Sequence, residues 1–315
     1  MVDGILWVFS RLFEAFGNII AALSEPSAWL SWVDPFLSGV RESGVSMSNE
    51  EKEALGRFIY YGGSIEFFFA ILVIFILILI VGLIFRPFLW RVATGLEFFA
   101  NWTGRIFAWA GLIMVLQQVM IVFLQRIFRI SEITVSPFGL PFSRDLSWWS
   151  EELKLYNAAI VALCAAYTFV QGGHVRVDLF YAGLRHGAKR MIDIFGSLFF
   201  IIPAMALTWL FGWFFMWRHL VTPKINATDE LDIILRKSRL LKENIEGIGF
   251  SPNGFDQYWM FKVLLVAFAG MMFLQAWAFF YRSLLELIEG PDSAGKGLDK
   301  DVLEDVTAEK AAEIH

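Results

Sequence analysis

Long apolar runs separated by charged residues are the main pattern along the chain. Each run lacks lysine, arginine, aspartate and glutamate. At a rise of 1.5 Å per residue, a helix of this length crosses a hydrocarbon core about 30 Å thick. The five runs are Phe67–Phe85, Ile106–Gln125, Leu155–Gly173, Ile194–Trp217 and Val263–Tyr281. The pattern therefore predicts an all-α integral membrane protein with five spanning helices.

The N-terminal segment Ile5–Leu23 has a different pattern. Its apolar residues recur at helical spacing on one side, whereas Arg11, Glu14 and Asn18 fall toward the other. This is typical of an amphipathic helix in the membrane interface, with a sixth span as the alternative. We expect the segment to be retained, because it lacks the uniform apolar core and cleavage site of a secretory signal. The mixed, acidic residues that follow, up to residue 64, predict a solvated connector.

The spans differ in their polar content, which indicates what each one faces. Phe67–Phe85 has almost only aliphatic and phenylalanine side chains, so we expect it to be peripheral. Gln118 and Gln125 share one face of the second span, and amides in hydrocarbon need a partner helix. The third span has an alanine stripe that includes Ala162, and we expect it to be the most enclosed helix. In the fourth span, Pro203 predicts a kink.

Composition and charge exclude several classes of protein. The chain has 57% hydrophobic residues among 315, well above a soluble domain. A net charge of -5 provides no basic surface for nucleic acid. The single cysteine, Cys164, lies in an apolar run and is interpreted as a buried structural thiol. Between the last two spans a polar insert, 219–254, predicts a surface helix that Thr228 could cap.

Candidate catalytic and cofactor motifs are weak. Gly290–Lys296 fits the G-x-x-x-x-G-K pattern, but Gly297 follows the lysine where a phosphate loop needs serine or threonine. All four histidines lie outside the charge-free runs, which argues against a haem subunit. We therefore expect no enzyme activity and no cofactor. A membrane anchor of a redox enzyme complex remains the alternative.

The stretch Gly172–Tyr181 links two spans and alternates polar and apolar residues. If it is extended, His174, Arg176 and Asp178 share one face. Two interpretations follow: an interfacial loop in which Arg176 and Asp178 satisfy each other, or a site. Because the spans are free of charge, we interpret the stretch as a brace at the membrane boundary.

An ordered set of motifs resembles a known family. A glutamine-rich span ends in Gln125–Phe128, then come Trp149–Glu152, the alanine-rich span and Gly173–Asp178. This order resembles the small membrane subunit (DctQ-type) of TRAP transporters, the tripartite ATP-independent periplasmic transporters, and within it the mannitol and chloroaromatic branch. Pro203 also fits. The resemblance covers roughly residues 98–288.

The resemblance implies a scaffold without chemistry of its own. Its partners would be a large, sodium-driven permease subunit (DctM-type), a periplasmic substrate-binding protein and membrane lipids, with sodium ions bound on the large subunit. The solute would be a small organic carboxylate. The chain would lie in the bacterial inner membrane with its C-terminus in the cytoplasm.

The expected organisation has four parts. Residues 1–64 form the amphipathic helix and connector, 65–95 an extra transmembrane helix and link, 96–288 a four-helix DctQ-like domain, and 289–315 an acidic tail. Residues expected to serve subunit contacts or local structure are Gln118, Gln125, Arg126, Trp149, Glu152, Ala162, Gly173, His174, Arg176, Asp178 and Pro203.

Overall fold

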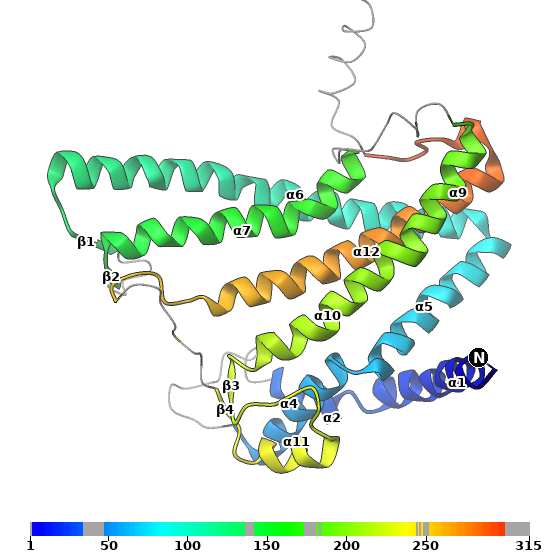
Figure 1. Cartoon of the computed structure of the whole chain (residues 1–315), viewed down its shortest axis with the longest axis horizontal. Coiled ribbons are helices and arrows are strands. Elements are labelled where there is room, and N and C mark those ends of the chain that lie inside the picture. The colour runs from blue at the N-terminus through cyan, green and yellow to red at the C-terminus, as the bar shows by residue number, and fades with distance from the viewer. Residues whose placement is uncertain are drawn as a thin grey trace, which may run out of the picture. The chain divides into compact units, whose positions relative to one another are not determined.

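The computed structural model describes residues 2–33, 47–135, 142–172, 181, 184–243, 245, 247 and 252–299 (Figure 1). Within these ranges, six helices are long and apolar enough to cross a membrane. They are Leu6–Ser24, Ile65–Ile84, Arg86–Phe128, Leu146–Gln171, His186–Trp217 and Trp259–Glu289. The prediction of an all-α integral membrane protein is confirmed. By its length and composition, the N-terminal helix is also a candidate span.

The secondary structure is almost entirely helical. The helices are α1 (Val2–Ser24), α2 (Ser27–Leu30), α4 (Asn49–Gly62), α5 (Ile65–Ile84), α6 (Arg86–Phe123), α7 (Leu146–Gln171), α9 (His186–Gly196), α10 (Ile202–Trp217), α11 (Leu231–Ser238) and α12 (Trp259–Glu289). Short helical turns are η1 (Ser31–Val33), η2 (Leu124–Phe128), η4 (Ser197–Ile201) and η5 (Pro291–Ser293). Two antiparallel ladders pair β1 (Glu132–Val135) with β2 (Phe142–Asp145) and β3 (Val221–Thr222) with β4 (Lys242–Glu243).

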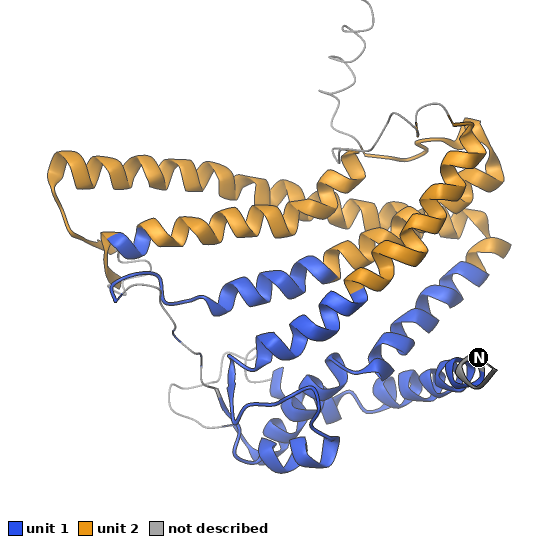
Figure 2. Ribbon diagram, viewed as in Figure 1, with its two compact units in different colours: residues 1–80, 147–149, 206–269 blue, residues 81–146, 150–205, 270–315 orange. Residues whose placement is uncertain are grey.

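The chain divides into two compact units, coloured in Figure 2. The first unit contains residues 1–80, 147–149 and 206–269. The second unit contains residues 81–146, 150–205 and 270–315. The long helices α5, α7, α10 and α12 contribute residues to both units.

The first unit contains a small apolar cluster outside the charge-free runs. Ser48 begins α4 with a capping box, in which its hydroxyl accepts from the Glu51 N–H and Glu51 accepts from the Ser48 N–H. Leu55 and Ile59 of α4 then pack with Ile234 of α11. Burial of these side chains supplies the free energy that fixes two short helices. The stretch before residue 64 is thus more than the solvated connector that its acidic composition predicts.

The polar insert forms α11, but not from the predicted cap. The helix begins at Leu231 after Glu230, and no side chain caps it. Instead, Asp229 accepts from the Asn226 N–H at 2.9 Å and from Lys237 Nζ at 2.7 Å. Burial alone would raise the pKa of Asp229, but these contacts outweigh it and lower the pKa below its ordinary value.

Two tryptophans of α10 attach to the end of α4 within the first unit. The Trp213 indole N–H donates to the Ile59 carbonyl at 2.8 Å, and that of Trp209 donates to the Gly62 carbonyl at 2.9 Å. A Cβ on Gly62 would lie 2.3 Å from the Trp213 ring. The glycine therefore lets the indole lie against the backbone, and the tryptophans act as helix contacts rather than only as interfacial anchors.

In the second unit, α6 and α7 approach closely. A Cβ on Gly104 would lie 2.2 Å from the Tyr167 Cβ, and the Cys164 thiol lies 3.3 Å from the Gly104 carbonyl. Cys164 is free and buried, so the prediction of a buried thiol is confirmed. The expectation that α7 is the most enclosed helix is wrong, because α12 buries a larger share of its span within the chain.

Irregular helical turns interrupt two of the candidate spans. A π-helical turn, η4, ends two residues before Pro203, whose missing N–H removes one helical hydrogen bond. This is the position at which the sequence predicts a kink. A second π-helical turn, η2, ends at Phe128 and is followed by Arg129, which adopts the left-handed conformation with φ of 53°.

Candidate functional site

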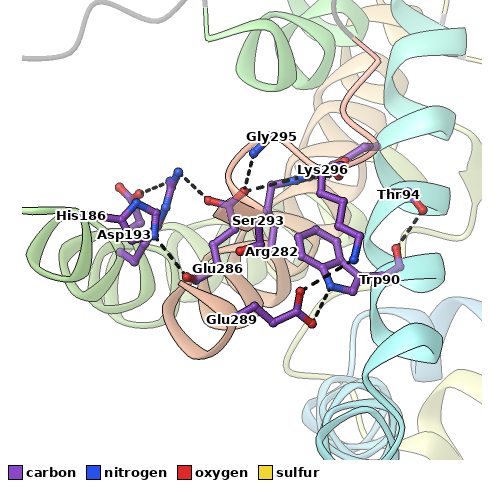
Figure 3. A network of polar contacts seen from close by, with 12 residues as sticks. Trp90, Thr94, His186, Asp193, Arg282, Glu286, Glu289, Ser293, Gly295 and Lys296 are labelled. Carbon is purple, nitrogen blue, oxygen red and sulfur yellow. Dashed lines mark hydrogen bonds and ion pairs between the residues drawn. The ribbon is translucent and has the colours of Figure 1, made fainter. Parts of the chain in front are cut away.

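A network of charged side chains connects α6, α9 and α12 within the second unit (Figure 3). The helices contribute their polar ends: the first half of α6, the start of α9 and the last turns of α12. The segment after α12 folds back onto the same side chains. All of these residues flank the charge-free runs, so the network is built from the parts of the helices that extend beyond them.

The centre of the network is the ion pair between Arg282 and Glu97. The Arg282 guanidinium donates through Nε and Nη2 to the two Glu97 oxygens, and the two residues are only 5% and 4% exposed. The guanidinium also lies 5.3 Å from the centre of the Trp90 ring. A bidentate pair satisfies both groups at once, which a buried charge requires. The pair thereby fastens α12 to α6.

Arg190 connects α9 to α12. Its guanidinium lies 2.5 Å from the Glu286 carboxylate and 3.1 Å from Asp193. His186 places Nε2 at 3.1 Å from the Glu286 main-chain carbonyl. Asp193 also accepts from the Tyr181 hydroxyl at 2.7 Å. Each charged group here has an opposite charge or a hydrogen-bond partner, as low exposure demands.

The segment that follows α12 closes the network. The Gly295 N–H donates to Glu286 Oε1 at 3.1 Å, and Arg282 Nη1 donates to the Lys296 carbonyl at 2.9 Å. Gly290 and Gly295, at φ of 90° and 73°, adopt backbone conformations that favour glycine. The glycines of the G-x-x-x-x-G-K match therefore serve a turn that wraps the Glu286 carboxylate.

Asp299 attaches the end of this segment to α6. Arg105 Nη1 lies 2.8 Å from its carboxylate, and the Asn101 amide donates to its main-chain carbonyl at 2.9 Å. Gln171 at the end of α7 donates to the same carbonyl at 3.0 Å. The Arg105 hydrogen bond holds the pKa of Asp299 below its ordinary value.

The network is suited to holding helices together. Its arginines are engaged by carboxylates, and its carboxylates by arginines, by the Trp90 indole or by a main-chain N–H group. Across the described ranges, His, Cys, Asp and Glu form no group of three or more that could hold a metal ion. Sequence reasoning missed the network because its charges lie far apart in the chain. The available signal was the charged residue next to each apolar run.

A second polar contact lies between α6 and α7. The Gln117 amide donates to Glu152 Oε2 at 3.1 Å, and the Tyr156 hydroxyl lies 3.4 Å from Oε1. Gln117 is 9% exposed, whereas the adjacent Gln118 is exposed. The structure therefore pairs Glu152 with Gln117, whereas Gln118, which we expect to face a partner helix, lies on the exposed side of α6.

The other predicted residues are spread over the second unit and the start of α7. Gln125 and Arg126 are exposed on η2, Trp149 is half-buried with its ring centre 5.3 Å from that of Trp148, Ala162 is buried in α7, and Pro203 is exposed on α10. Gly173, His174, Arg176 and Asp178 lie outside the described residues. The predicted roles of all of these residues in subunit contacts stay predictions.

The fold defines a multi-pass helical membrane protein with polar contacts between its helices. Residues 119–230 match the family model of the DctQ component of tripartite ATP-independent periplasmic transporters. The matched range runs from the second half of α6 to the polar insert, and it includes Glu152 and Pro203. The match supports the small-permease family of TRAP transporters, which are systems of the inner membrane. No curated protein and no solved structure matches the chain.

Proposed function

We propose that this chain is the small membrane subunit of a TRAP transporter and serves as a scaffold for a large permease subunit. The observation that carries the proposal is the family match over residues 119–230. Exposed amides support it: Gln118 and Gln125 lie on the outside of a candidate span. Lipid tails cannot satisfy an amide, whereas a neighbouring membrane protein can.

The proposed division of labour leaves the transport chemistry to the partners. The large subunit binds the solute, a small organic carboxylate, together with the sodium ions that drive uptake. A periplasmic binding protein delivers the solute and docks in part on this chain. The motif order at Gln125–Phe128 and Gly173–Asp178 supports the mannitol and chloroaromatic branch.

The proposed topology places the C-terminus in the cytoplasm. Segments 86–105 and 172–193 then share the cytoplasmic side, and they carry lysine and arginine slightly more densely than 126–154 does. The charge network between α6, α9 and α12 lies on that same side, and the polar insert with α11 lies on the periplasmic side.

Isolation of the native complex tests the proposal. The full chain, tagged at its C-terminus, is extracted from its own membranes in a mild detergent, and the copurifying proteins are identified by mass spectrometry. We expect a much larger membrane permease in fixed ratio to this chain. Recovery of the chain alone, or with a redox enzyme and a haem absorption band, would overturn the proposal.

A further inference from the structure

The side chains of α1 between Phe9 and Leu23 form three sectors. Leu12, Ala15 and Ile19 pack against α5. A polar sector contains Ser10, Arg11, Glu14 and Asn18, and an exposed apolar sector contains Phe9, Phe13, Phe16, Ile20 and Leu23. At 100° per residue, the polar and apolar sectors lie on opposite sides, with the α5 contact between them on one flank.

The apolar cluster that joins α1 to α5 uses the first turns of α5. On α5 it involves Phe68, Phe69, Leu72 and Val73, near the start of that helix at Ile65. On α1 it extends from Trp7, whose ring centre lies 5.8 Å from that of Phe69, to Ile19. These ranges correspond to about 18 Å of α1 and about 7.5 Å of α5. If the two helices ran side by side through the bilayer, the contact would have the same length on both. Because it is longer on α1, the axis of α1 is inclined to that of α5.

The C-terminal end of α1 is connected through Trp29 to α4, the helix that precedes α5. The Trp29 indole N–H donates to the Ala22 carbonyl at 3.1 Å. The Trp29 ring stacks on Phe58 of α4 with ring centres 6.4 Å apart. α4 itself ends only a few residues before α5 begins. Both the middle and the end of α1 are therefore held at the level at which α5 starts.

The charges of α1 fit the same placement. Arg11 and Glu14 form an ion pair of 2.6 Å with side chains 37% and 53% exposed. In a spanning helix this pair would lie in the hydrocarbon without further polar partners, which is unfavourable. In a helix parallel to the membrane surface, the polar sector faces water and the phenylalanines face acyl chains.

We propose that α1 lies in the plane of the membrane, at the face where α5 begins, and that its exposed apolar sector binds the acyl chains of that lipid leaflet. The helix then anchors the α4–α11 cluster of the first unit to the lipid surface. Of the six candidate spans in the described residues, the other five then cross the membrane.

Nitroxide depth measurements test this placement. The full chain, with Cys164→Ala and one spin label at Phe9, Phe13, Phe16, Ile20 or Leu23, is reconstituted with its native partners in phospholipid nanodiscs. Collisions with oxygen and with a water-soluble nickel complex report the depth of each label. We expect all five labels at a similar shallow depth of about 5–10 Å. Labels at Glu14 and Asn18 should be accessible to the nickel complex.

Labels on α5 provide the matched control. Ile74, Ile80 and Ile84 are exposed on a helix that spans, so their depths must change along the chain by 1.5 Å per residue. A similar gradient on α1, of about 21 Å between Phe9 and Leu23, would overturn the proposal in favour of a sixth span. Exclusion of both reagents from all five labels would also overturn it, because a protein surface would then cover the apolar sector.

Discussion

Arg282 and Glu97 form a buried bidentate ion pair although 185 residues separate them in the chain. The pair joins two helices whose polar ends extend beyond the charge-free runs. Removal of one partner leaves the other charge buried without compensation. We therefore expect Arg282→Met to lower the free energy of unfolding by about 3–5 kcal/mol. The thermal midpoint of the detergent-solubilised protein measures the change.

A surface arginine supplies the control for this variant. Arg239 is highly exposed, and its Nε lies 3.7 Å from Glu53. An exposed pair of this kind contributes at most about 1 kcal/mol. Arg239→Met should therefore leave the midpoint nearly unchanged. The double variant Glu97→Gln with Arg282→Met should regain part of the loss; equal midpoints for the single and the double variant would contradict the pairing.

Gly104 and Gly95 provide a matched pair on α6. A Cβ on Gly104 would meet Tyr167 at 2.2 Å, whereas nothing lies within 4 Å of a Cβ on Gly95. Gly104→Ala should separate α6 from α7 and destabilise the protein by about 1–3 kcal/mol. Gly95→Ala should be neutral or stabilising by up to about 1 kcal/mol, since alanine favours the helix. The thermal midpoints of the two variants are measured in the same detergent. Equal midpoints would contradict the prediction, because they would show that α6 and α7 can accommodate the added methyl group at residue 104.

The neighbouring amides of α6 separate packing within the chain from packing against a partner. Gln117→Leu removes the hydrogen bond to Glu152 and should lower the thermal midpoint of the isolated chain. Gln118→Leu changes only an exposed side chain and should leave that midpoint unchanged. In native membranes, however, Gln118→Leu should reduce the yield of the complex with the large subunit. Wild-type yield would mean that this face meets lipid.

The attachment of the C-terminal segment should depend on pH through Asp299. Its pKa is lowered by Arg105, so the ionised form stabilises the attachment above the ordinary aspartate range. That contribution is lost as the pH falls through the lowered pKa, below about 4. A spin label at the exposed Ala294 should become more mobile over this range.

Two substitutions test the pH dependence. Asp299→Asn should raise the mobility of the label at neutral pH and remove most of its change below pH of about 4. Asp292→Asn, on the same segment, should behave as the wild type. The same pH profile in the wild type and in Asp299→Asn would refute a role for this carboxylate.

The spans were predictable because hydrocarbon admits only long charge-free runs, but the ends of the helices were not. The second span was predicted to begin at Ile106, whereas α6 begins at Arg86 and continues through Glu97. A polar helix of this kind is stable because its charges meet partners from distant parts of the chain. Local sequence shows that Glu97 is charged, but it does not show which residue neutralises it.

The polar contacts inside the spans were also only partly predictable from the sequence. The sequence predicts amides on the second span that need partners, and one amide does bind Glu152. A helix turns by 100° per residue, so Gln117 and Gln118 point in very different directions. No periodic pattern in the surrounding apolar residues distinguishes the inward amide from the outward one. The packing of α7 against α6 determines which amide faces inward, and Gly104 permits the close approach of the two helices.

The separation of Glu97 from Arg282 also has a consequence for biosynthesis. A ribosome that adds about 5–20 residues per second needs roughly 10–40 s to extend the chain by 185 residues, from Glu97 to Arg282. During that interval α6 has emerged while its counter-ion does not yet exist. Glu97 must remain hydrated or protonated until α12 is inserted, so the polar contacts of α6 are completed long after α6 itself has been made.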